Sequence, residues 1–385
     1  MKRRIVLILA LILLLCTATS CGNGEEENSA TPSSSAESSA DEASGDYSEE
    51  EEAVAETDLH YHTKTFWLKD LEGTHESTVV ENGVLTLEGD ATSGSFVTEM
   101  NVGSFTTMLA SWNATTSGGS SVEMSVSFEA EDGNWSDYMS WGVWSSSPGT
   151  SASPSNSDEY GKMGIDILTV KSGHTATGNI KIRLELQKGG KKPKVRNFSI
   201  TTPQIENQQT VDVAALPESA LNDVPMRSQL APENGSDGNR ICSPATTVMA
   251  LEYMGTKLRT MTAARGIYDN GWKAYGNWSY AVAYAGEKGY LAYLDLYDRD
   301  MMKYALSQGY VIGCSTSLTS SGHIVLLVGY TVIDGEEYYI CNDPNVNASN
   351  PQRTNYKMDY FEARWFKSEM GNRGVAYVFA QRGEQ

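Results

Sequence analysis

The stretch Ile241-Cys-Ser-Pro-Ala-Thr-Thr-Val-Met-Ala-Leu-Glu-Tyr-Met-Gly255 decides the fold of the second half of this chain. Pro244 lacks an N–H group and has a preset φ, which suits the first turn of a helix. Apolar residues follow it at helical spacing, and Gly255 fits the carboxy-terminal stop. We therefore predict a helix that begins at Cys242 and ends just before Gly255.

This helix would place Cys242 at its positive end. A thiol is a useful nucleophile only as a thiolate, and the partial charge of a helix N-terminus favours that ionised form. Backbone N–H groups in the same turn can also hold a developing oxyanion. The alternatives are a buried, inert cysteine or one half of a disulfide, and this motif alone does not decide among the three.

His323 is the only histidine after residue 174, and it opens an apolar strand over residues 324–330. The strand leads to Asp334-Gly, the strongest two-residue hairpin signal, so the chain is expected to turn back there. The return strand ends at Asn342-Asp-Pro344, near the end of the sheet that carries His323. This is the arrangement of a general base and the polar residue that orients it.

The register of this hairpin decides which residue faces His323. A strict two-residue turn sets residue 323 opposite residue 346 and puts Asn342 on the face of His323. A one-residue bulge would give the role to Asp343 instead. The ordinary alternative is a satisfied histidine beside an Asn-Asp-Pro turn, and the sequence leaves these choices open.

The chain before residue 203 has a different pattern, with apolar and polar residues alternating at period two. Residues 122–128 and 180–186 show the alternation clearly, and Gly and Ser clusters such as Ser117-Gly-Gly-Ser-Ser121 separate such segments. We therefore predict an all-β sandwich over residues 59–203. Helix-like and strand-like segments mix later, which predicts an α+β domain over residues 210–385.

One segment of the predicted sandwich is rich in aromatic residues, namely Trp135, Tyr138, Trp141 and Trp144. Exposed tryptophans can stack on sugar rings, so carbohydrate or cell-wall contact is one interpretation. Small β domains more often bury such rings, and the alternation from Trp141 to Trp144 is typical of a strand with one face in the core. We favour packing and keep carbohydrate contact as the alternative.

The amino terminus has the features of a secretory signal, because basic residues at positions 2–4 precede an apolar run from Ile5 to Leu15. That run is too short to span a bilayer comfortably, which takes about 20 residues. Ala18-Thr-Ser-Cys21 is similar to the lipobox of bacterial lipoproteins, in which the cysteine is lipidated. Residues 1–21 are therefore predicted to be a lipoprotein signal peptide; an ordinary cleaved signal and a transmembrane anchor are the alternatives. Lipidation of Cys21 would hold the protein at the cell surface, on the outer face of a bacterial membrane.

Residues 22–58 contain thirteen carboxylates and no Lys or Arg, whereas the whole chain has a formal net charge of -20. With few large apolar residues to bury, this segment is predicted to be a disordered tether. Most of the acidity therefore lies in the tether, and the low pI indicates no cationic partner. Nothing in the composition favours nucleic acid binding.

The predicted second domain contains six short motifs in sequence. They are Val224-Pro-Met-Arg-Ser-Gln229, Ile241-Cys-Ser-Pro-Ala245, Tyr275-Gly-Asn-Trp-Ser-Tyr-Ala-Val-Ala-Tyr-Ala-Gly286, Gly322-His323, Asn342-Asp-Pro344 and Gly374-Val-Ala-Tyr-Val-Phe379. Together they resemble a papain-like cysteine peptidase, and more narrowly the extracellular relatives of the double-glycine leader peptidases of bacteriocin transporters. The resemblance implies a papain-like fold and an enzyme that cleaves a peptide or protein substrate through an acyl-enzyme, without a cofactor. Together with the lipidation signal at Cys21, this predicts a surface-anchored cysteine peptidase.

The resemblance also implies roles for four residues. Cys242 corresponds to the nucleophile and His323 to the general base. Asp343, in preference to Asn342, corresponds to the residue that orients the histidine. Gln229 corresponds to the side-chain donor of the oxyanion hole.

Two departures from the family pattern lie close to these residues. Ser243 stands where relatives often have glycine, and its side chain could crowd the substrate carbonyl. The loop from Leu230 to Ile241 is longer than usual, which affects the segment that must position Gln229.

Other chemistry is a poorer fit to the sequence. Cys, His and Asp can ligate zinc, but no close-spaced ligand pair occurs, so we expect no metal. Cys314 and Cys341 lie in strand-like segments, where a disulfide and two small core residues are both compatible with the pattern. The alternative to an enzyme is a non-catalytic extracellular binding protein that retains a papain-like fold. The sequence does not identify a substrate.

Overall fold

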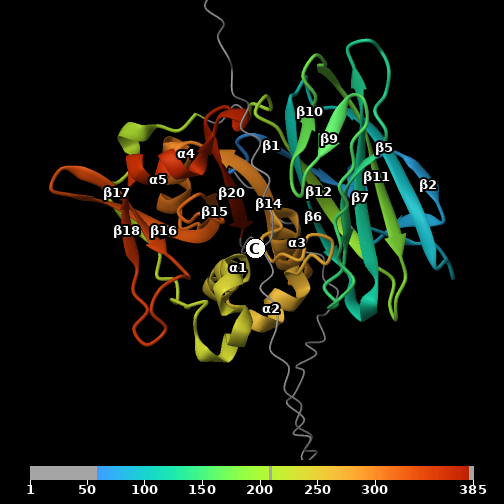
Figure 1. Cartoon of the computed structure of the whole chain (residues 1–385). Helices are drawn as coiled ribbons and strands as arrows, with labels where there is room; N and C mark the ends of the chain where they lie inside the picture. Colours follow the sequence, from blue (N-terminus) through green and yellow to red (C-terminus); the bar gives the residue numbers. More distant parts are fainter. Residues whose placement is uncertain (1–58, 208–209, 381–385) are drawn as a thin grey trace, which may run out of the picture. The chain divides into compact units, whose positions relative to one another are not determined.

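The computed structural model describes residues 59–207 and 210–380 (Figure 1). The signal peptide, the lipidation site Cys21 and the acidic tether predicted for the first 58 residues lie outside the described residues. Within the part of the chain that is described, no helix is both long and apolar enough to cross a membrane.

Two antiparallel sheets form the amino-terminal part of the described chain. The first contains β3 (Thr78–Glu81), β4 (Val84–Leu87), β12 (Lys194–Thr201), β6 (Thr107–Thr115), β10 (Leu168–Val170) and β9 (Gly161–Met163) in this order, with β1 (Thr63–Trp67) paired to β12. The second contains β2 (Thr74–Glu76), β5 (Ser93–Asn101), β11 (Ala176–Gln187), β7 (Ser121–Ala130) and β8 (Met139–Trp144). The predicted β domain is confirmed.

The period-two pattern accounts for the core of this domain. Apolar residues of β7 and β11, such as Val126 and Ile182, are fully buried and lie opposite one another across the ladder. Alternate residues of β11, such as Lys181 and Arg183, face outward and are partly exposed. Burial of the apolar set favours this register because a slip of one residue would reverse the faces.

A third sheet and five helices form the carboxy-terminal part. The sheet order is β14 (Leu291–Tyr297), β20 (Arg373–Ala380), β15 (Ile312–Thr316), β16 (His323–Ile333), β17 (Glu336–Asn342) and β18 (Thr354–Lys357), with β13 (Ala220–Leu221) beside β16 and β19 (Phe366–Lys367) beside β20. The helices are α1 (Cys242–Tyr253), α2 (Thr260–Ile267), α3 (Trp278–Glu287), α4 (Arg299–Ser307) and α5 (Met358–Trp365). Strands therefore make up most of the regular structure (Figure 1).

Helix α1 begins and ends where the sequence predicts. Its first residue is Cys242, and Gly255 has a φ of 99° just beyond its last turn. Gly255 N–H donates to the carbonyl of Glu252 at 3.0 Å, and Thr256 N–H donates to the carbonyl of Leu251 at 2.8 Å. These two bonds form a Schellman motif, which requires the left-handed conformation that glycine adopts at low cost.

The hairpin between β16 and β17 turns at the predicted place, because Asp334 and Gly335 have φ values of 52° and 79°. Such a pair of positive φ values is typical of the tight hairpin turn with Asp-Gly at its centre. Pairing is regular from the turn back to Gly329, which lies opposite Ile340.

A β-bulge then interrupts the pairing of β16 and β17. Leu327 lies opposite Cys341, although Gly329 lies opposite Ile340, so Val328 is an extra residue on β16. No side chain fits at Gly329, where a Cβ atom would overlap the carbonyl oxygen of Ala220. The bulge changes which residues of β17 share a face with the first residues of β16.

Polar side chains of β6 join the sandwich to the third sheet. Asn113 Nδ2 donates to the carbonyl of Ala292 at 2.7 Å, and Asn113 Oδ1 accepts the Ala292 N–H at 3.0 Å. Ser111 Oγ accepts the N–H of Leu294 at 3.2 Å. Every residue of β6 up to Ala114 is buried, and one hydrophobic core contains side chains of both parts.

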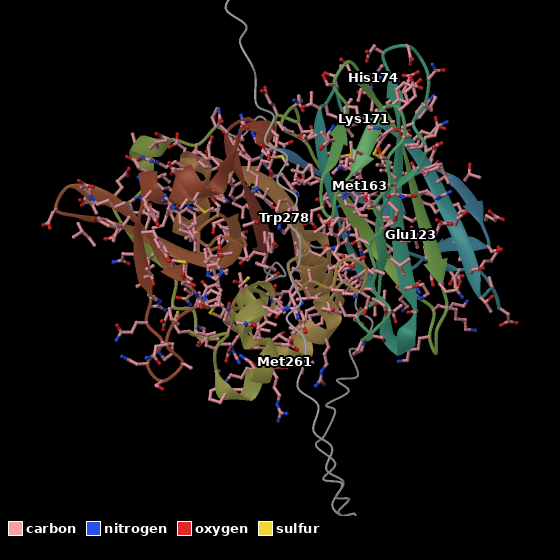
Figure 2. All side chains as sticks on the ribbon, viewed as in Figure 1. Glu123, Met163, Lys171, His174, Met261 and Trp278 are labelled. Carbon is pink, nitrogen blue, oxygen red and sulfur yellow. The ribbon has the colours of Figure 1, made fainter. Side chains whose placement is uncertain are left out.

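Two further hydrogen bonds link the sandwich to the helices. The backbone N–H of Trp278, labelled in Figure 2, donates to Asp166 Oδ1 at 2.7 Å. Trp144 Nε1 donates to the carbonyl of Gly266 at 3.3 Å. Burial of Asp166 raises the pKa of its carboxyl to about 8. The sandwich is therefore not loosely appended, because it contributes buried polar groups to the start of α3 and the end of α2.

Candidate active site

Cys242 lies at the N-terminus of α1 as a free cysteine of intermediate exposure. Pro244 occupies the first turn, where its missing N–H would have no helical partner. The thiol therefore combines access from solvent with the positive end of a helix, which is where reactive cysteines are found.

The imidazole of His323 lies between the thiol of Cys242 and the carboxylate of Asp343. His323 Nε2 is 2.7 Å from Asp343 Oδ1, and the ring also forms a hydrogen bond with the Cys242 side chain. Burial of the ring acts to lower its pKa, but the hydrogen bonds and charges of Asp343 and Cys242 outweigh burial and raise the pKa of His323 to about 9. A protonated His323 is therefore stabilised at neutral pH.

Asp343 is nearly buried, and both of its carboxylate oxygens are hydrogen-bonded. Oδ1 accepts from Asn345 N–H at 2.8 Å as well as from His323, and Oδ2 accepts from the Tyr356 hydroxyl at 2.7 Å. Burial acts to raise the pKa of Asp343, but the donors, His323 first among them, outweigh it and hold the pKa below its usual value. Asp343 is thus an anion directed at the imidazole.

Asn342 is turned away from His323, so the strict hairpin pairing is wrong at this end of the sheet. Its Nδ2 donates to the carbonyl of Val224 at 3.2 Å, and its Oδ1 accepts from Arg353 Nε at 3.2 Å. The physical reason is the extra residue Val328 in β16, which shifts the register by one.

Gln229 is buried, and its backbone is fixed on both sides. Its N–H donates to the carbonyl of Pro344 at 2.7 Å, and its carbonyl accepts from Asn234 Nδ2 at 2.9 Å. Gln229 Oε1 is buried and has no hydrogen-bond partner among the described residues. Asn234 belongs to a 3₁₀ segment, Pro232–Arg240, so the long loop folds back and holds Gln229.

Ser243 does not project into solvent. Its side chain is fully buried, and its hydroxyl faces the buried phenol of Tyr377. The expectation that Ser243 crowds a bound carbonyl is therefore not supported by its position.

Tyr356 and Asn234 are residues of this site that the sequence motifs missed. Tyr356 lies in β18, which pairs with β17 so that Tyr356 is opposite Tyr339. The segment before β18, residues 343–353, is too long for a tight hairpin turn to set this register, and asparagine at position 234 is one of many polar residues in its loop. Only the folded arrangement brings either residue to the site.

The described part of the chain bears on two other features, metal ligands and a disulfide. It contains no group of three or more His, Cys, Asp and Glu side chains that could hold a metal ion. Cys314 and Cys341 are both fully buried and free, so they are core residues and form no disulfide with each other.

The aromatic segment of the sandwich is largely occupied by internal contacts. Trp141 and Trp144 are fully buried. The ring of Trp135 is covered by Lys181 Nζ at 4.1 Å from its centroid, and the ring of Tyr138 by the Arg183 guanidinium at 4.2 Å. Packing therefore accounts for Trp141 and Trp144, whereas Trp135 and Tyr138 are half-buried beneath cationic side chains.

Two family profiles match the chain. The Peptidase C39-like family matches residues 221–371, and the Peptidase C39 N-terminal domain matches residues 60–202. The first match contains every residue placed at the site, from Gln229 to Tyr356. No curated protein is significantly similar to the chain.

Three solved structures share a limited likeness with the chain. The first is TmCBM61 in complex with beta-1,4-galactotriose, with a TM-score of 0.19 and 14% identity, covering 36% of this chain and 88% of that chain. The second is PfGH50B, with a TM-score of 0.19 and 14% identity, covering 36% of this chain and 24% of that chain. The third is a GH26-CBM35 beta-(1,4)-mannanase from Podospora anserina, with a TM-score of 0.18 and 9% identity, covering 46% of this chain and 33% of that chain. The chain thus spans a quarter to a third of the length of the two larger proteins.

Proposed function

We propose that this protein is a cysteine peptidase that cleaves peptide bonds through an acyl-enzyme, since residues 221–371 match the Peptidase C39-like family. The observation that carries the proposal is the line of contacts from Cys242 through His323 to Asp343. A thiol, a base and an orienting carboxylate are the parts that nucleophilic catalysis requires.

The first half of the reaction transfers the acyl group to the enzyme. The Cys242 thiolate attacks the carbonyl carbon of the scissile bond while the imidazolium of His323 carries the proton. That proton passes to the leaving amine as the C–N bond breaks and a thioester forms. Because Nε2 is bonded to Asp343, Nδ1 is the nitrogen that exchanges the proton.

The second half of the reaction restores the thiolate. Neutral His323 takes a proton from water, the hydroxide attacks the thioester carbonyl, and the C–S bond breaks to release the acid. The negative oxygen formed in each half is held by the backbone N–H of Cys242 and by Gln229 Nε2. The fixed backbone of Gln229 supports this role, since the donor would need no rearrangement during the reaction.

We further propose a papain-like arrangement for the catalytic domain and attachment to the outer face of a bacterial membrane through a lipid at Cys21. The substrates would then be peptides or proteins at the cell surface. Carbohydrate or cell-wall contact by the sandwich is a weaker proposal, because its aromatic rings are buried or covered by cationic side chains.

Alkylation by iodoacetamide across pH tests the activated thiol, with mass spectrometry to locate the modified cysteine. We expect Cys242 to react faster near neutral pH than a free cysteine does, because only the thiolate is the nucleophile. Replacement of His323 by Ala should move its profile to that of a free cysteine. Cys314 and Cys341 are internal controls, because both are fully buried and should not react in the folded chain.

His174→Ala is the matched control variant, because His174 lies in the sandwich (Figure 2) and is itself partly exposed. If Cys242 reacts no faster near neutral pH than a free cysteine, and His323→Ala changes nothing, the chain is a binding protein that keeps the fold without the chemistry. Peptide hydrolysis retained in full by Cys242→Ala would also overturn the proposal. A peptide library screened with the folded chain would identify the substrate.

A further inference from the structure

A tyrosine hydroxyl completes the set of donors around Asp343. Tyr356 donates to Asp343 Oδ2 at 2.7 Å, whereas His323 lies on Oδ1 at 2.7 Å. The two oxygens of one carboxylate are therefore bound by different partners, one of which is the proposed base. Because Asp343 is only 7% exposed, water cannot readily replace either partner.

The ring of Tyr356 is held by its strand and by α5. Tyr356 pairs with Tyr339 across β17 and β18. Its ring lies parallel to that of Tyr360, with centroids 6.3 Å apart, and 5.9 Å from that of Phe361. These contacts direct the hydroxyl at Asp343 without relying on the bond to Asp343 itself.

The hydroxyl of Tyr356 also remains a donor at neutral pH and above. Burial first, and the adjacent Asp343 carboxylate second, raise the pKa of Tyr356 well above its usual value of 10.0. A phenol that stays protonated can stabilise an anionic acceptor at any pH at which the thiolate works.

We propose that Tyr356 is a positioning residue that keeps the Asp343 carboxylate directed at His323, and so maintains the thiolate and imidazolium pair at neutral pH. This inference rests on the proposed peptidase function. Without the hydroxyl, Asp343 Oδ2 is a buried acceptor with no partner, and rotation of the carboxylate to find another donor removes Oδ1 from His323. The imidazolium then loses the anion that stabilises it beside the thiol.

Tyr356→Phe tests this role, because it removes only the hydroxyl. Loss of a charge-assisted hydrogen bond corresponds to a change of about tenfold to a hundredfold. We expect alkylation of Cys242 by iodoacetamide at pH 6 to slow by about tenfold or more. At pH 10, where any accessible thiol is ionised, the rate should be unchanged. Peptide hydrolysis should lose kcat while KM stays the same.

Tyr339→Phe is the matched control. Tyr339 lies opposite Tyr356 in the same sheet, is fully buried, and donates its hydroxyl to the carboxylate Glu362 Oε1 at 2.9 Å. This variant should lower thermal stability to a similar extent but leave the alkylation profile as it is in the unsubstituted chain.

The possible outcomes distinguish a failure of the positioning role of Tyr356 from a failure of the proposed peptidase function. An unchanged profile in Tyr356→Phe, or the same change in Tyr339→Phe, would show a merely structural tyrosine and overturn the inference alone. Slow alkylation of the unsubstituted chain at pH 6 would overturn the proposed function, and the inference with it. A rate lowered at pH 6 only in Tyr356→Phe supports the positioning role.

Discussion

The backbone N–H of Gln229 donates to the carbonyl of Pro344 at 2.7 Å, one residue beyond Asp343. Ser228 Oγ reinforces this junction by donating to the carbonyl of Val346 at 2.6 Å. The proposed oxyanion donor and the residue that orients the base are therefore fixed to each other. The position of Gln229 depends on this junction, which is why the long loop that follows does not displace it.

Gln229→Ala separates oxyanion stabilisation from activation of the thiol. Loss of one oxyanion donor costs about 100- to 1000-fold in kcat. We expect a loss of this size in peptide hydrolysis, with no change in the pH profile of Cys242 alkylation, because alkylation forms no oxyanion. Gln308→Ala, at an exposed position after α4, is the control for loss of an amide. A changed alkylation profile in Gln229→Ala would place this side chain in a different role.

Asn234→Ala tests whether the loop holds Gln229 in place. Its Nδ2 donates to the carbonyls of Gln229 at 2.9 Å and Ser228 at 3.3 Å, and leaving a buried carbonyl unpaired costs about 1–3 kcal/mol. We expect lower thermal stability and a loss of kcat smaller than that of Gln229→Ala. The exposed Asn350→Ala should change neither. Full activity in a stably folded Asn234→Ala would show that Pro344 alone positions Gln229.

Asp343→Asn and Asn342→Ala distinguish the two neighbours at the end of β17. An amide at position 343 can no longer stabilise the imidazolium, and the comparable change in a serine protease lowers kcat about 10⁴-fold. We expect a loss of a thousandfold or more for Asp343→Asn. Asn342→Ala should mainly lower stability, because its partners are Val224 and Arg353 rather than His323. Measurements of kcat and of thermal unfolding would check both variants. A larger loss of kcat in Asn342→Ala than in Asp343→Asn would contradict the assignment of Asp343 as the residue that orients His323.

Local patterns were sufficient for the elements that carry the site. Helix α1 and the turn at Asp334-Gly335 are dictated by residues with special backbone preferences, and their sequence signals are therefore short and strong. Alternation likewise placed strands at residues 122–128 and 180–186. The predicted site depended on these elements.

Nonlocal contacts account for what the sequence did not reveal. The bulge at Val328 depends on how β13 and β17 flank β16, and this one residue decides between Asn342 and Asp343. Ser111 and Asn113 of β6 have polar side chains, which are typical of the solvent-facing side of a strand. Both are nevertheless buried against β14. A period-two pattern shows which residues are polar, but it does not show whether they face water or a polar partner in another element. The packing of the sandwich against β14 was therefore not predicted.

Stability should fall as pH rises, because a buried acid lies where the sandwich meets α3. Burial raises the pKa of Asp166 to about 8, with Asp269 acting in the same direction and Lys367 against it, whereas the ordinary value is 3.8. Between about pH 4 and 8 the folded chain therefore holds a proton that the unfolded chain releases. The stabilisation is fully present below pH 4 and is lost as pH approaches 8.

Asp166→Asn removes this titration, because an amide stays neutral and its oxygen can still accept the Trp278 N–H. We expect chemical denaturation at pH 5 and pH 8 to show that the unsubstituted chain loses about 3.5 kcal/mol more than Asp166→Asn over this interval. Asp295, whose pKa burial raises to about 7, titrates in both proteins and cancels in the difference. The exposed Asp90→Asn should behave as the unsubstituted chain does. Parallel pH curves for Asp166→Asn and the unsubstituted chain would mean that Asp166 is ionised in the folded protein.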